Sequence, residues 1–393
     1  MTQPTESVIS GSQRPDFPAD AWDRAPWNRW TFQHIGEILP TTPVRNNPDR
    51  ISPLPTSLQK IETIAFRDAG KPTSVGEWLD TSFTDGFIVL SKNEIVYERY
   101  FNGMDQATLH LAQSVSKSVT GTACGILVSR GLIDPQRSLM DVVPELADTA
   151  FRHATLRHVL DMTSGVRFDE NYIDPYSDAG RIDVASGWKQ PTLPGQWPAS
   201  MLELILALKT LVRSHGEKFE YRSIETDIIT LVMEKVTGKR LADIISDEIW
   251  QPIGAEAIAS FTIDRTGFAL GDGGFNACLR DFARFGLLWA NHGMASGKRL
   301  ISENWIEETR TGDATLFHQP YTDILPMGAY RNQFWLKQAK GQVLLCRGVF
   351  GQLIYIDLEK NFVAVKLSSW PDFTDPARMK TAISAIDHVA ANF

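Results

Sequence analysis

Two groups of apolar, strand-like segments lie far apart in the chain and are separated by a long helical stretch. The first group is a hairpin, residues 86–91 and 94–101, in which runs of Ile, Val, Tyr and Phe are broken by the polar pair Lys92–Asn93. The second group is a set of four strands at 333–337, 342–346, 352–356 and 362–368. Because strands must bury their apolar faces together, we expect one antiparallel sheet built from both ends of the chain.

The intervening stretch has the periodicity of helices. Helical patterns occupy 156–162, 200–212, 224–236 and 241–250, and two more cover 276–290 and 379–391. The expected fold class is α/β, of the α+β type: an antiparallel sheet flanked by helices from both chain ends, with an inserted mostly helical domain. We place the α/β domain at 56–135 and 266–393, and the helical domain at 136–265. Residues 1–55, which contain several tryptophans, are expected to form an irregular arm packed on the body.

Composition narrows the classes of partner. The 393 residues are 43% hydrophobic and 22% charged, as in ordinary globular proteins, and their net charge of −8 gives no basic stripe for nucleic acid or an anionic membrane. No apolar run reaches the roughly 18 residues of a membrane span, and residues 1–20 lack the apolar core of a signal peptide. A cytoplasmic protein with three buried thiols, at Cys124, Cys278 and Cys346, and with no metal or other cofactor, is the expectation.

A Ser-x-x-Lys motif opens the apolar run that ends near Gly131. Residues three apart share one helical face, so Ser114 and Lys117 would share a pocket. The first turn of a helix also favours developing negative charge, which suits a nucleophilic serine with a lysine as its base. The same spacing recurs at 57–60 and 186–189, but neither copy begins an apolar helix, and we interpret both as accidental.

Two further features would complete such a site. A tyrosine could share the proton with the lysine, because its hydroxyl both donates and accepts, and Tyr221 and Tyr330 are the candidates. Gly348 and Gly351 lie between two strands, where glycine permits close approach of the backbone to a ligand. An N–H from that strand edge, together with the N–H of Ser114, could bind an oxyanion. The alternative for the glycine segment is a β-bulge at a sheet edge.

The order of these motifs resembles the serine β-lactamase and penicillin-recognising family, in its class C and carboxylesterase-like branch. Ser114-x-x-Lys117, then Tyr221-x-Ser223, then a glycine-bearing strand follow the family's order. Similar blocks lie at 156–166, 233–243, 249–254 and 280–286. Within the family the sequence is most similar to the 6-aminohexanoate-dimer hydrolases, through blocks at 28–32, 114–118, 169–175, 186–188 and 366–372.

The resemblance implies a role for each matching residue. Ser114 would be the acylated nucleophile, Lys117 the general base and Tyr221 its proton partner. The N–H groups of Ser114 and Val349 would hold the oxyanion. Four further residues would lie on the substrate side: Tyr172 to help an amide nitrogen leave, Trp188 as a mobile aromatic wall, and Asp183 and Asp272 where a substrate ammonium is handled.

The sequence also departs from the family. Arg347-Gly348-Val349 replaces the usual Lys-Thr-Gly or His-x-Gly, which argues against efficient β-lactam hydrolysis, although Arg347 could still meet a substrate carboxylate. We therefore expect a serine hydrolase that acts, through an acyl-enzyme, on small-molecule substrates: short-chain carboxylic esters, 6-aminohexanoate-type linear amides, or both. The alternatives are a D-alanyl peptidase or β-lactamase-type enzyme, and a non-catalytic binding module on the same fold. A homodimer is left open.

Overall fold

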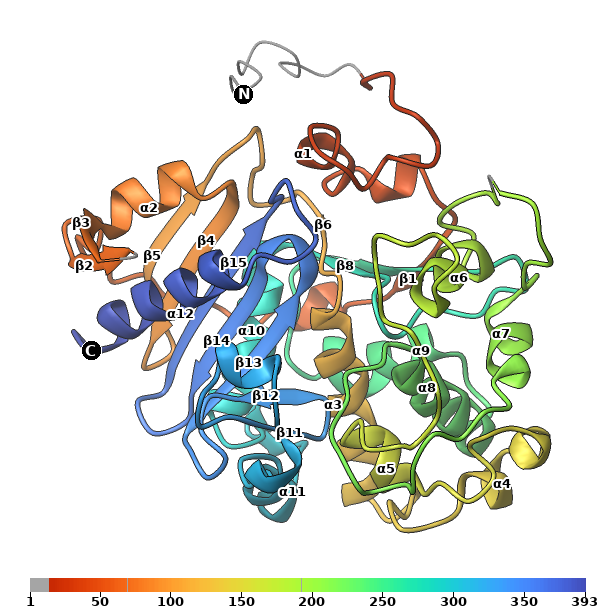
Figure 1. The fold of residues 1–393 in the computed structure, drawn as a ribbon. Helices are drawn as coiled ribbons and strands as arrows, with labels where there is room; N and C mark the ends of the chain where they lie inside the picture. Colours follow the sequence, from red (N-terminus) through yellow and green to blue (C-terminus); the bar gives the residue numbers. More distant parts are fainter. Residues whose placement is uncertain (1–13, 69, 192) are drawn as a thin grey trace.

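A seven-stranded antiparallel sheet forms the larger layer of the protein (Figure 1). The computed structural model describes residues 14–68, 70–191 and 193–393, so the first 13 residues of the expected arm lie outside it. The strand order is β11-β12-β13-β14-β15-β4-β5. The bounds are Thr84–Ser91 for β4, Glu94–Tyr100 for β5, Ala329–Arg331 for β11, Phe334–Leu336 for β12, Val343–Gly348 for β13, Gln352–Asp357 for β14 and Phe362–Ser368 for β15.

Strand β15 pairs directly with β4, which joins the two ends of the chain in one sheet, as predicted. Helix α10 (Leu279–Ala290) packs on one face of the sheet, and helices α2 (Val75–Thr81) and α12 (Pro376–Ala390) lie on the other (Figure 1). Gly286 allows α10 to approach closely, because a Cβ there would lie 2.5 Å from Val363 of β15. The predicted fold class, an antiparallel sheet flanked by helices from both chain ends, is confirmed.

The middle of the chain is mostly helical and lies beside the sheet (Figure 1). Its helices are α4 (Leu139–Val142), α5 (Leu156–Leu160), α6 (Asp178–Ala185), α7 (Met201–Ala207), α8 (Ile224–Thr237) and α9 (Leu241–Ile245), the last continued by a π turn, Ser246–Trp250. The predicted helix at 200–212 ends earlier because Thr210 and Val212 pair in extended form with Arg167 and Gly165. The boundaries proposed for the two domains remain a prediction.

The N-terminal arm is more regular than expected. It contains helix α1 (Asn28–Thr31) and strand β1 (Thr41–Val44). Strand β1 pairs with β7 (Ala259–Thr262) in a second, four-stranded sheet with β8 (Phe275–Ala277) and β6 (His110–Leu111). Because 275–277 are used in that sheet, the helix predicted from residue 276 begins only at Leu279.

Helix α3 (Val115–Ser129) lies between the sheet and the helical region (Figure 1). It is buried from Val115 to Leu127, which its small residues permit. A Cβ on Gly121 would lie 2.9 Å from the backbone oxygen of Asn332, and one on Gly125 would lie 2.1 Å from the Trp305 indole nitrogen. Gly121 and Gly125 share one helical face, so close packing of that face holds in place the helix at whose start Ser114 stands.

Two sequence expectations about the remaining chain can be compared with the structure. Cys124, Cys278 and Cys346 are buried free thiols, as predicted. Among the residues that the structure describes, no helix is both long enough and apolar enough to cross a membrane.

Candidate active site

Ser114 and Lys117 lie in direct contact at the start of α3. Ser114 is the N-cap residue, but its side chain makes no capping hydrogen bond to the helix. Its Oγ instead accepts a hydrogen bond of 3.0 Å from Lys117 Nζ. Gln113, immediately before it, has a left-handed φ of +50°, a conformation that costs free energy and that surrounding contacts must hold. The Ser114 hydroxyl therefore contacts the lysine amine and does not cap the helix.

The Lys117 amine is completely buried and has a second partner, Asp272. It donates to the Asp272 backbone oxygen at 2.8 Å and lies 3.3 Å from the carboxylate Oδ2. Burial alone would lower the pKa of Lys117, but the acidic groups Tyr221 and Asp272 outweigh burial and raise it above its ordinary value. Lys117 is therefore an ammonium in the resting site. Asp272 is paired with this lysine and also lines the pocket; its expected contact with a substrate cation stays a prediction.

Tyr221 is the tyrosine that reaches this pair. It lies just before α8, where its backbone N–H donates to the Tyr321 hydroxyl at 2.9 Å and its ring stacks on Trp335 at 5.2 Å. Burial raises the pKa of Tyr221, while the charge of Lys117 and a hydrogen bond with Ser114 lower it; the net shift is upward. The other candidate, Tyr330, packs edge-on against the Tyr221 ring, and its hydroxyl contacts Gln333.

A second buried acid, Asp227, stands behind Lys117 and was not predicted from the sequence. Its Oδ1 accepts the backbone N–H of Gly271 at 3.0 Å. Burial and the neighbouring charge of Asp272 raise the pKa of Asp227 well above its usual range. Asp227 lies in the first turn of α8, where acidic residues are favoured in any helix, so the sequence offers no signal that marks it as part of a site.

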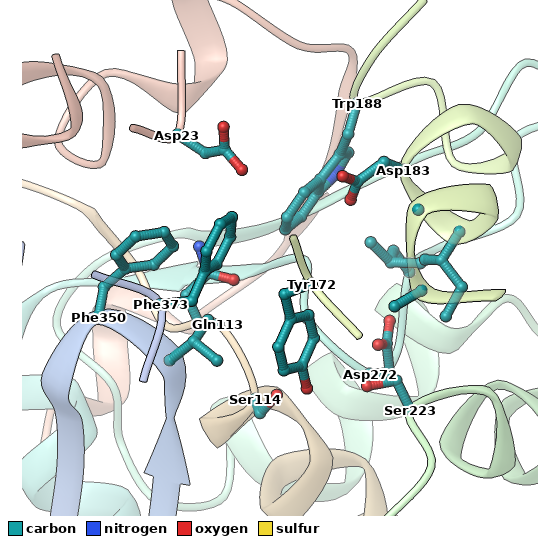
Figure 2. Close-up of a pocket in the computed structure, with 16 residues that line it drawn as sticks. Asp23, Gln113, Ser114, Tyr172, Asp183, Trp188, Ser223, Asp272, Phe350 and Phe373 are labelled. Carbon is teal, nitrogen blue, oxygen red and sulfur yellow. The ribbon is translucent and has the colours of Figure 1, made fainter. Parts of the chain in front are cut away.

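A pocket opens above Ser114 (Figure 2). Most of the residues expected at the site line it: Ser114, Tyr172, Asp183, Trp188, Asp272 and Val349. Residues that the sequence did not point to line it as well: Asp23, Phe350 and Phe373. Arg347 does not. Its guanidinium lies over the Trp335 ring, 4.5 Å from the centroid, and burial lowers its pKa to about 10.

Val349 reaches the pocket from a turn between β13 and β14, and not from a strand edge or a bulge. The turn, Val349–Gly351, contains Phe350 with a left-handed φ of +59°. Gly348 allows the turn to approach the nucleophile, because a Cβ there would lie 2.8 Å from the Ala112 oxygen, two residues before Ser114. The absence of a side chain at Gly348 thus allows these two backbone segments to lie in contact.

Tyr172 lies over the Ser114 end of the pocket (Figure 2). Its ring stacks on Phe373 at 5.8 Å, and its hydroxyl donates to Glu170 Oε1 at 2.6 Å. Glu170 also accepts the Ser223 hydroxyl and, at 2.9 Å, the Ser223 backbone N–H. Burial raises the pKa of Glu170, and the charge of Lys117 opposes it. Ser223, which replaces the family's asparagine, is thus tied to a carboxylate missed from the sequence.

The far end of the pocket carries two acids and one lysine. Asp23 and Asp183 lie at the opposite end from Ser114 (Figure 2). Lys189 Nζ lies 2.8 Å from Asp23 and 2.9 Å from Asp183. Lys189 belongs to the Ser-x-x-Lys copy interpreted as accidental; it does not start an apolar helix, but its amine reaches the pocket wall.

Trp188 forms the aromatic wall beside these acids. Its indole N–H donates to Thr262 Oγ1 at 2.9 Å, and its backbone oxygen accepts the Trp22 indole N–H at 2.8 Å. The Trp22 and Trp188 rings pack edge to face at 5.3 Å. Trp188 is therefore anchored at both its backbone and its side chain, and the movement expected of it is still a prediction.

The chain is similar to known proteins over most of its length. A 6-aminohexanoate-dimer hydrolase from Paenarthrobacter ureafaciens is 34% identical over 357 residues, which cover 90% of this chain and 88% of that protein. A solved Bacillus anthracis protein, provisionally described as a 6-aminohexanoate-dimer hydrolase, superposes with a TM-score of 0.87 at 27% identity, over 100% of this chain and 98% of that one. A family VIII carboxylesterase superposes with a TM-score of 0.57 at 17% identity, over 77% of this chain and 92% of that one. This likeness supports the fold alone.

The family model described as Beta-lactamase matches residues 84–387, which include the contact between Ser114 and Lys117 and the Val349 turn. With most of the chain matched in this way, and a named hydrolase aligned over nine tenths of it, the chain belongs to the β-lactamase family and is a hydrolase.

Proposed function

We propose that this hydrolase forms an acyl-enzyme at Ser114 and cleaves short-chain carboxylic esters, 6-aminohexanoate-type linear amides, or both. The observation that carries the proposal is the 3.0 Å contact between Lys117 Nζ and Ser114 Oγ at the base of a pocket. A serine becomes a useful nucleophile when a neighbouring group can take its proton. Tyr221 extends that group to a proton-sharing pair.

Acylation begins when Ser114 Oγ attacks the substrate carbonyl carbon and its proton passes to the Lys117–Tyr221 pair. The resting Lys117 is an ammonium and cannot accept a proton. The active form of the enzyme is therefore the one in which the Lys117–Tyr221 pair has lost one proton. Such a pair titrates as a unit, so the missing proton is not assigned to either residue alone. The N–H groups of Ser114 and Val349 hold the oxyanion. The pair then passes its proton to the leaving alcohol or amine as the bond to carbon breaks.

Deacylation repeats these transfers with water. Water attacks the acyl carbon, its proton passes to the same pair, and Ser114 recovers a proton as the carboxylic acid leaves. Every proton in this cycle is carried by side chains of the site, and no cofactor or metal is part of the proposed steps.

Two observations bear on the substrate. An alcohol leaves readily, whereas an amine must be protonated as it leaves, and the Tyr172 hydroxyl held by Glu170 stands where it could assist. At the far end, the carboxyl groups of Asp23 and Asp183 face the Lys189 amine, and Arg24 Nε lies 3.9 Å from Asp23. Ester hydrolysis depends less on a proton donor such as Tyr172, and we expect it to be the faster activity. Amide cleavage in the same pocket is the second candidate, and it is favoured by the acids.

The test is hydrolysis of p-nitrophenyl acetate by the wild type and by Ser114→Ala. We expect the substitution to reduce kcat/KM by a factor of about 10⁴ or more, since the nucleophile is lost. A fluorophosphonate should label Ser114 covalently, as detected by mass spectrometry of the intact and digested protein. Equal turnover by the two proteins would overturn the proposal.

The β-lactamase and D-alanyl peptidase alternatives are tested with nitrocefin. The family's third motif contains a lysine that this chain replaces by Arg347, which stacks on Trp335 outside the pocket wall. We therefore expect nitrocefin turnover far below ester turnover. Nitrocefin turnover comparable to the ester rate would favour the alternative.

A further inference from the structure

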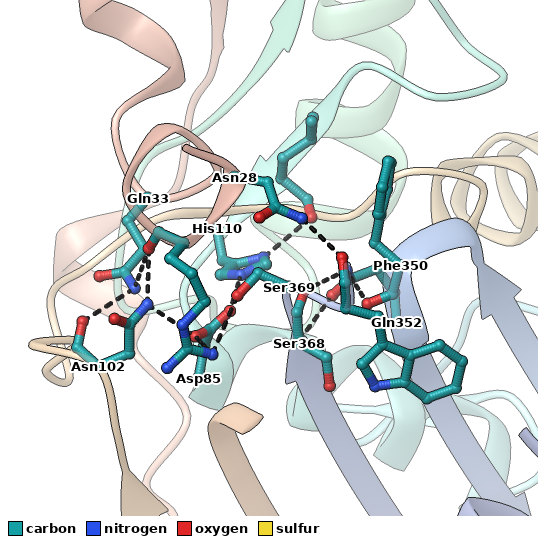
Figure 3. Close-up of polar contacts among 12 residues, drawn as sticks. Asn28, Gln33, Asp85, Asn102, His110, Phe350, Gln352, Ser368 and Ser369 are labelled. Carbon is teal, nitrogen blue, oxygen red and sulfur yellow. Dashed lines mark hydrogen bonds and ion pairs between the residues drawn. The ribbon is translucent and has the colours of Figure 1, made fainter. Parts of the chain in front are cut away.

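Helix α1 and the residue after it make hydrogen bonds to Trp370, which contacts the Val349 turn, and to the segment just before Ser114. Figure 3 shows Asn28 beside this turn. Asn28 Nδ2 donates to the backbone oxygen of Trp370 at 2.7 Å. Phe32 accepts, through its backbone oxygen, the N–H of Leu111 at 2.8 Å, three residues before Ser114. One short element of the N-terminal arm therefore connects the two sides of the proposed oxyanion site.

The contact with Trp370 leads directly to the Val349 turn. The backbone N–H of Trp370 donates to the oxygen of Phe350 at 3.1 Å. The Trp370 indole also fills the space over Gly351, where a Cβ would lie only 2.2 Å from the ring. Phe350 has a left-handed φ of +59°, a conformation that persists only where neighbouring contacts hold it. Trp370 supplies such contacts, and Asn28 holds Trp370.

Gln352 supports the same turn from the other side (Figure 3). Its Nε2 donates to the Ser368 oxygen at 2.6 Å and to the Phe350 oxygen at 3.4 Å, while its Oε1 accepts the Ser368 N–H at 3.1 Å. This clamp ties β14 to β15. The turn is also held by the Phe350 N–H, which donates to the Phe373 oxygen at 2.9 Å, and by the Phe32 ring of the arm, which packs edge-on against Phe350 at 5.2 Å. The Asn28 contact is the hydrogen bond through which the arm holds Trp370.

Asn28 is 0% exposed, so removing its side chain takes a buried hydrogen bond from the Trp370 oxygen. We infer that Asn28 is a positioning residue for the oxyanion site, acting through Trp370 on the Val349 turn. The inference rests on the proposed function, because the orientation of the Val349 N–H matters to the rate only if an oxyanion forms at Ser114.

The experiment compares an ester with the thionoester of the same acid and alcohol. A thiolate-like sulfur accepts hydrogen bonds poorly, so turnover of the thionoester depends much less on the N–H donors. The ratio of the two kcat/KM values reports on the oxyanion site, and it does not depend on the fraction of folded enzyme. The variants are Asn28→Ala and, as matched control, Thr31→Val, which removes another buried 2.7 Å hydrogen bond of the arm, from Thr31 Oγ1 to the Trp22 oxygen.

We expect Asn28→Ala to lower ester kcat/KM about tenfold, mainly through kcat, since a misplaced donor costs less than the 10²–10³-fold of a deleted one. Thionoester kcat/KM should fall less than about threefold, and Thr31→Val should leave the ratio unchanged. Equal losses on both substrates, or no loss, would overturn the inference. An active Ser114→Ala enzyme would instead overturn the proposed function itself.

If Asn28→Ala yields no folded protein, Ser369→Ala tests the same inference. Arg29 Nη1 of the same helix donates to Ser369 Oγ at 3.2 Å, next to Trp370. We expect this milder change to lower the ester-to-thionoester ratio in the same direction, by about two- to threefold. An unchanged ratio in a folded Ser369→Ala enzyme would then count against the inference.

Discussion

The Lys117 amine lies 2.8 Å from the backbone oxygen of Asp272 and 3.3 Å from its carboxylate. The acid therefore holds the proposed base twice, once through the main chain and once through the side chain. Only the second contact carries charge, and that charge helps to raise the pKa of Lys117. A substitution of the Asp272 side chain can therefore change the protonation of Lys117 while the backbone contact still holds its position.

Asp272→Asn should move the pH dependence of kcat/KM towards lower pH. The substitution removes a negative charge that raises the pKa of Lys117, so the Lys117–Tyr221 pair loses its proton at lower pH, while the backbone contact remains. We expect the midpoint of the rise in kcat/KM to fall by about one pH unit, the size typical of one close charge. Ester hydrolysis followed across neutral to alkaline pH measures it.

The control for that shift is Asp247→Asn, which removes an exposed acid paired with Lys239. It changes the net charge of the protein by the same amount as Asp272→Asn. Its midpoint should match the wild type. A midpoint that stays fixed in Asp272→Asn, or moves to higher pH, would contradict the assignment of Lys117 to the proton-accepting pair.

Tyr172→Phe should separate amide from ester hydrolysis. The ring stack on Phe373 survives the change, whereas the hydroxyl held by Glu170 is lost. Amide kcat should fall about 10²-fold, the usual contribution of a positioned proton donor, and ester kcat less than about threefold. Rates on 6-aminohexanoate dimer and on p-nitrophenyl acetate test this, with the exposed Tyr176→Phe as control. Parallel losses on both substrates would remove Tyr172 from the leaving-group step.

The contact between nucleophile and lysine was predictable because it is local. Ser114 and Lys117 are brought together by one turn of helix, and the apolar, small-residue run that follows identifies that helix as buried. The contact between Lys189 and Asp23 joins residues 166 positions apart, which no local pattern encodes. Such long-range contacts explain why Asp23, Asp227 and Lys189 were missed.

The fold likewise contains elements that local sequence predicts and others that long-range contacts determine. Long periodic segments such as α8 match the expected bounds closely, because most of the helix, Ile224 to Met233, is buried. The segment 208–212 has helical periodicity but is extended, because its backbone pairs with the 165–167 loop. Tertiary hydrogen bonds override a weak local preference there.

Gly121→Ala should destabilise the fold. Alanine is intrinsically favoured over glycine in a helix by about 1 kcal/mol. At this position, however, the added methyl would lie 2.6 Å from Gln333 Cβ and 2.9 Å from the Asn332 oxygen. Overpacking of this kind costs about 1–3 kcal/mol, so after the helix preference is subtracted we expect a net loss of up to about 2 kcal/mol in the free energy of unfolding. Urea unfolding followed by circular dichroism measures the change.

Gly36→Ala is the matched control for Gly121→Ala, since a Cβ at Gly36 meets nothing within 4 Å. Its free energy of unfolding should stay within about 0.5 kcal/mol of the wild type. A Gly121→Ala protein as stable as the wild type would show that α3 is less tightly packed than the structure indicates.

Lys189→Met should alter the choice of substrate at the far end of the pocket. The Lys189 amine now lies between Asp23 and Asp183, within 3 Å of each. A substrate ammonium would have to share these acids with a lysine that is already in place. Methionine keeps much of the length of the side chain and removes the charge. Asp183 then loses its lysine partner and Asp23 keeps only the 3.9 Å contact with Arg24, so the two acids become more available to a cationic substrate.

The comparison uses p-nitrophenyl 6-aminohexanoate and p-nitrophenyl heptanoate, in which a methyl group replaces the ammonium. We expect Lys189→Met to raise the charged-to-uncharged ratio of kcat/KM about tenfold, an effect that added salt should weaken. Lys209→Met, which removes a lysine bound to the Asp148 backbone oxygen, should leave the ratio unchanged. Asp23→Asn combined with Lys189→Met should return it towards the wild-type value. A ratio that falls in Lys189→Met would mean that Lys189 organises the two acids for the substrate instead of competing with it.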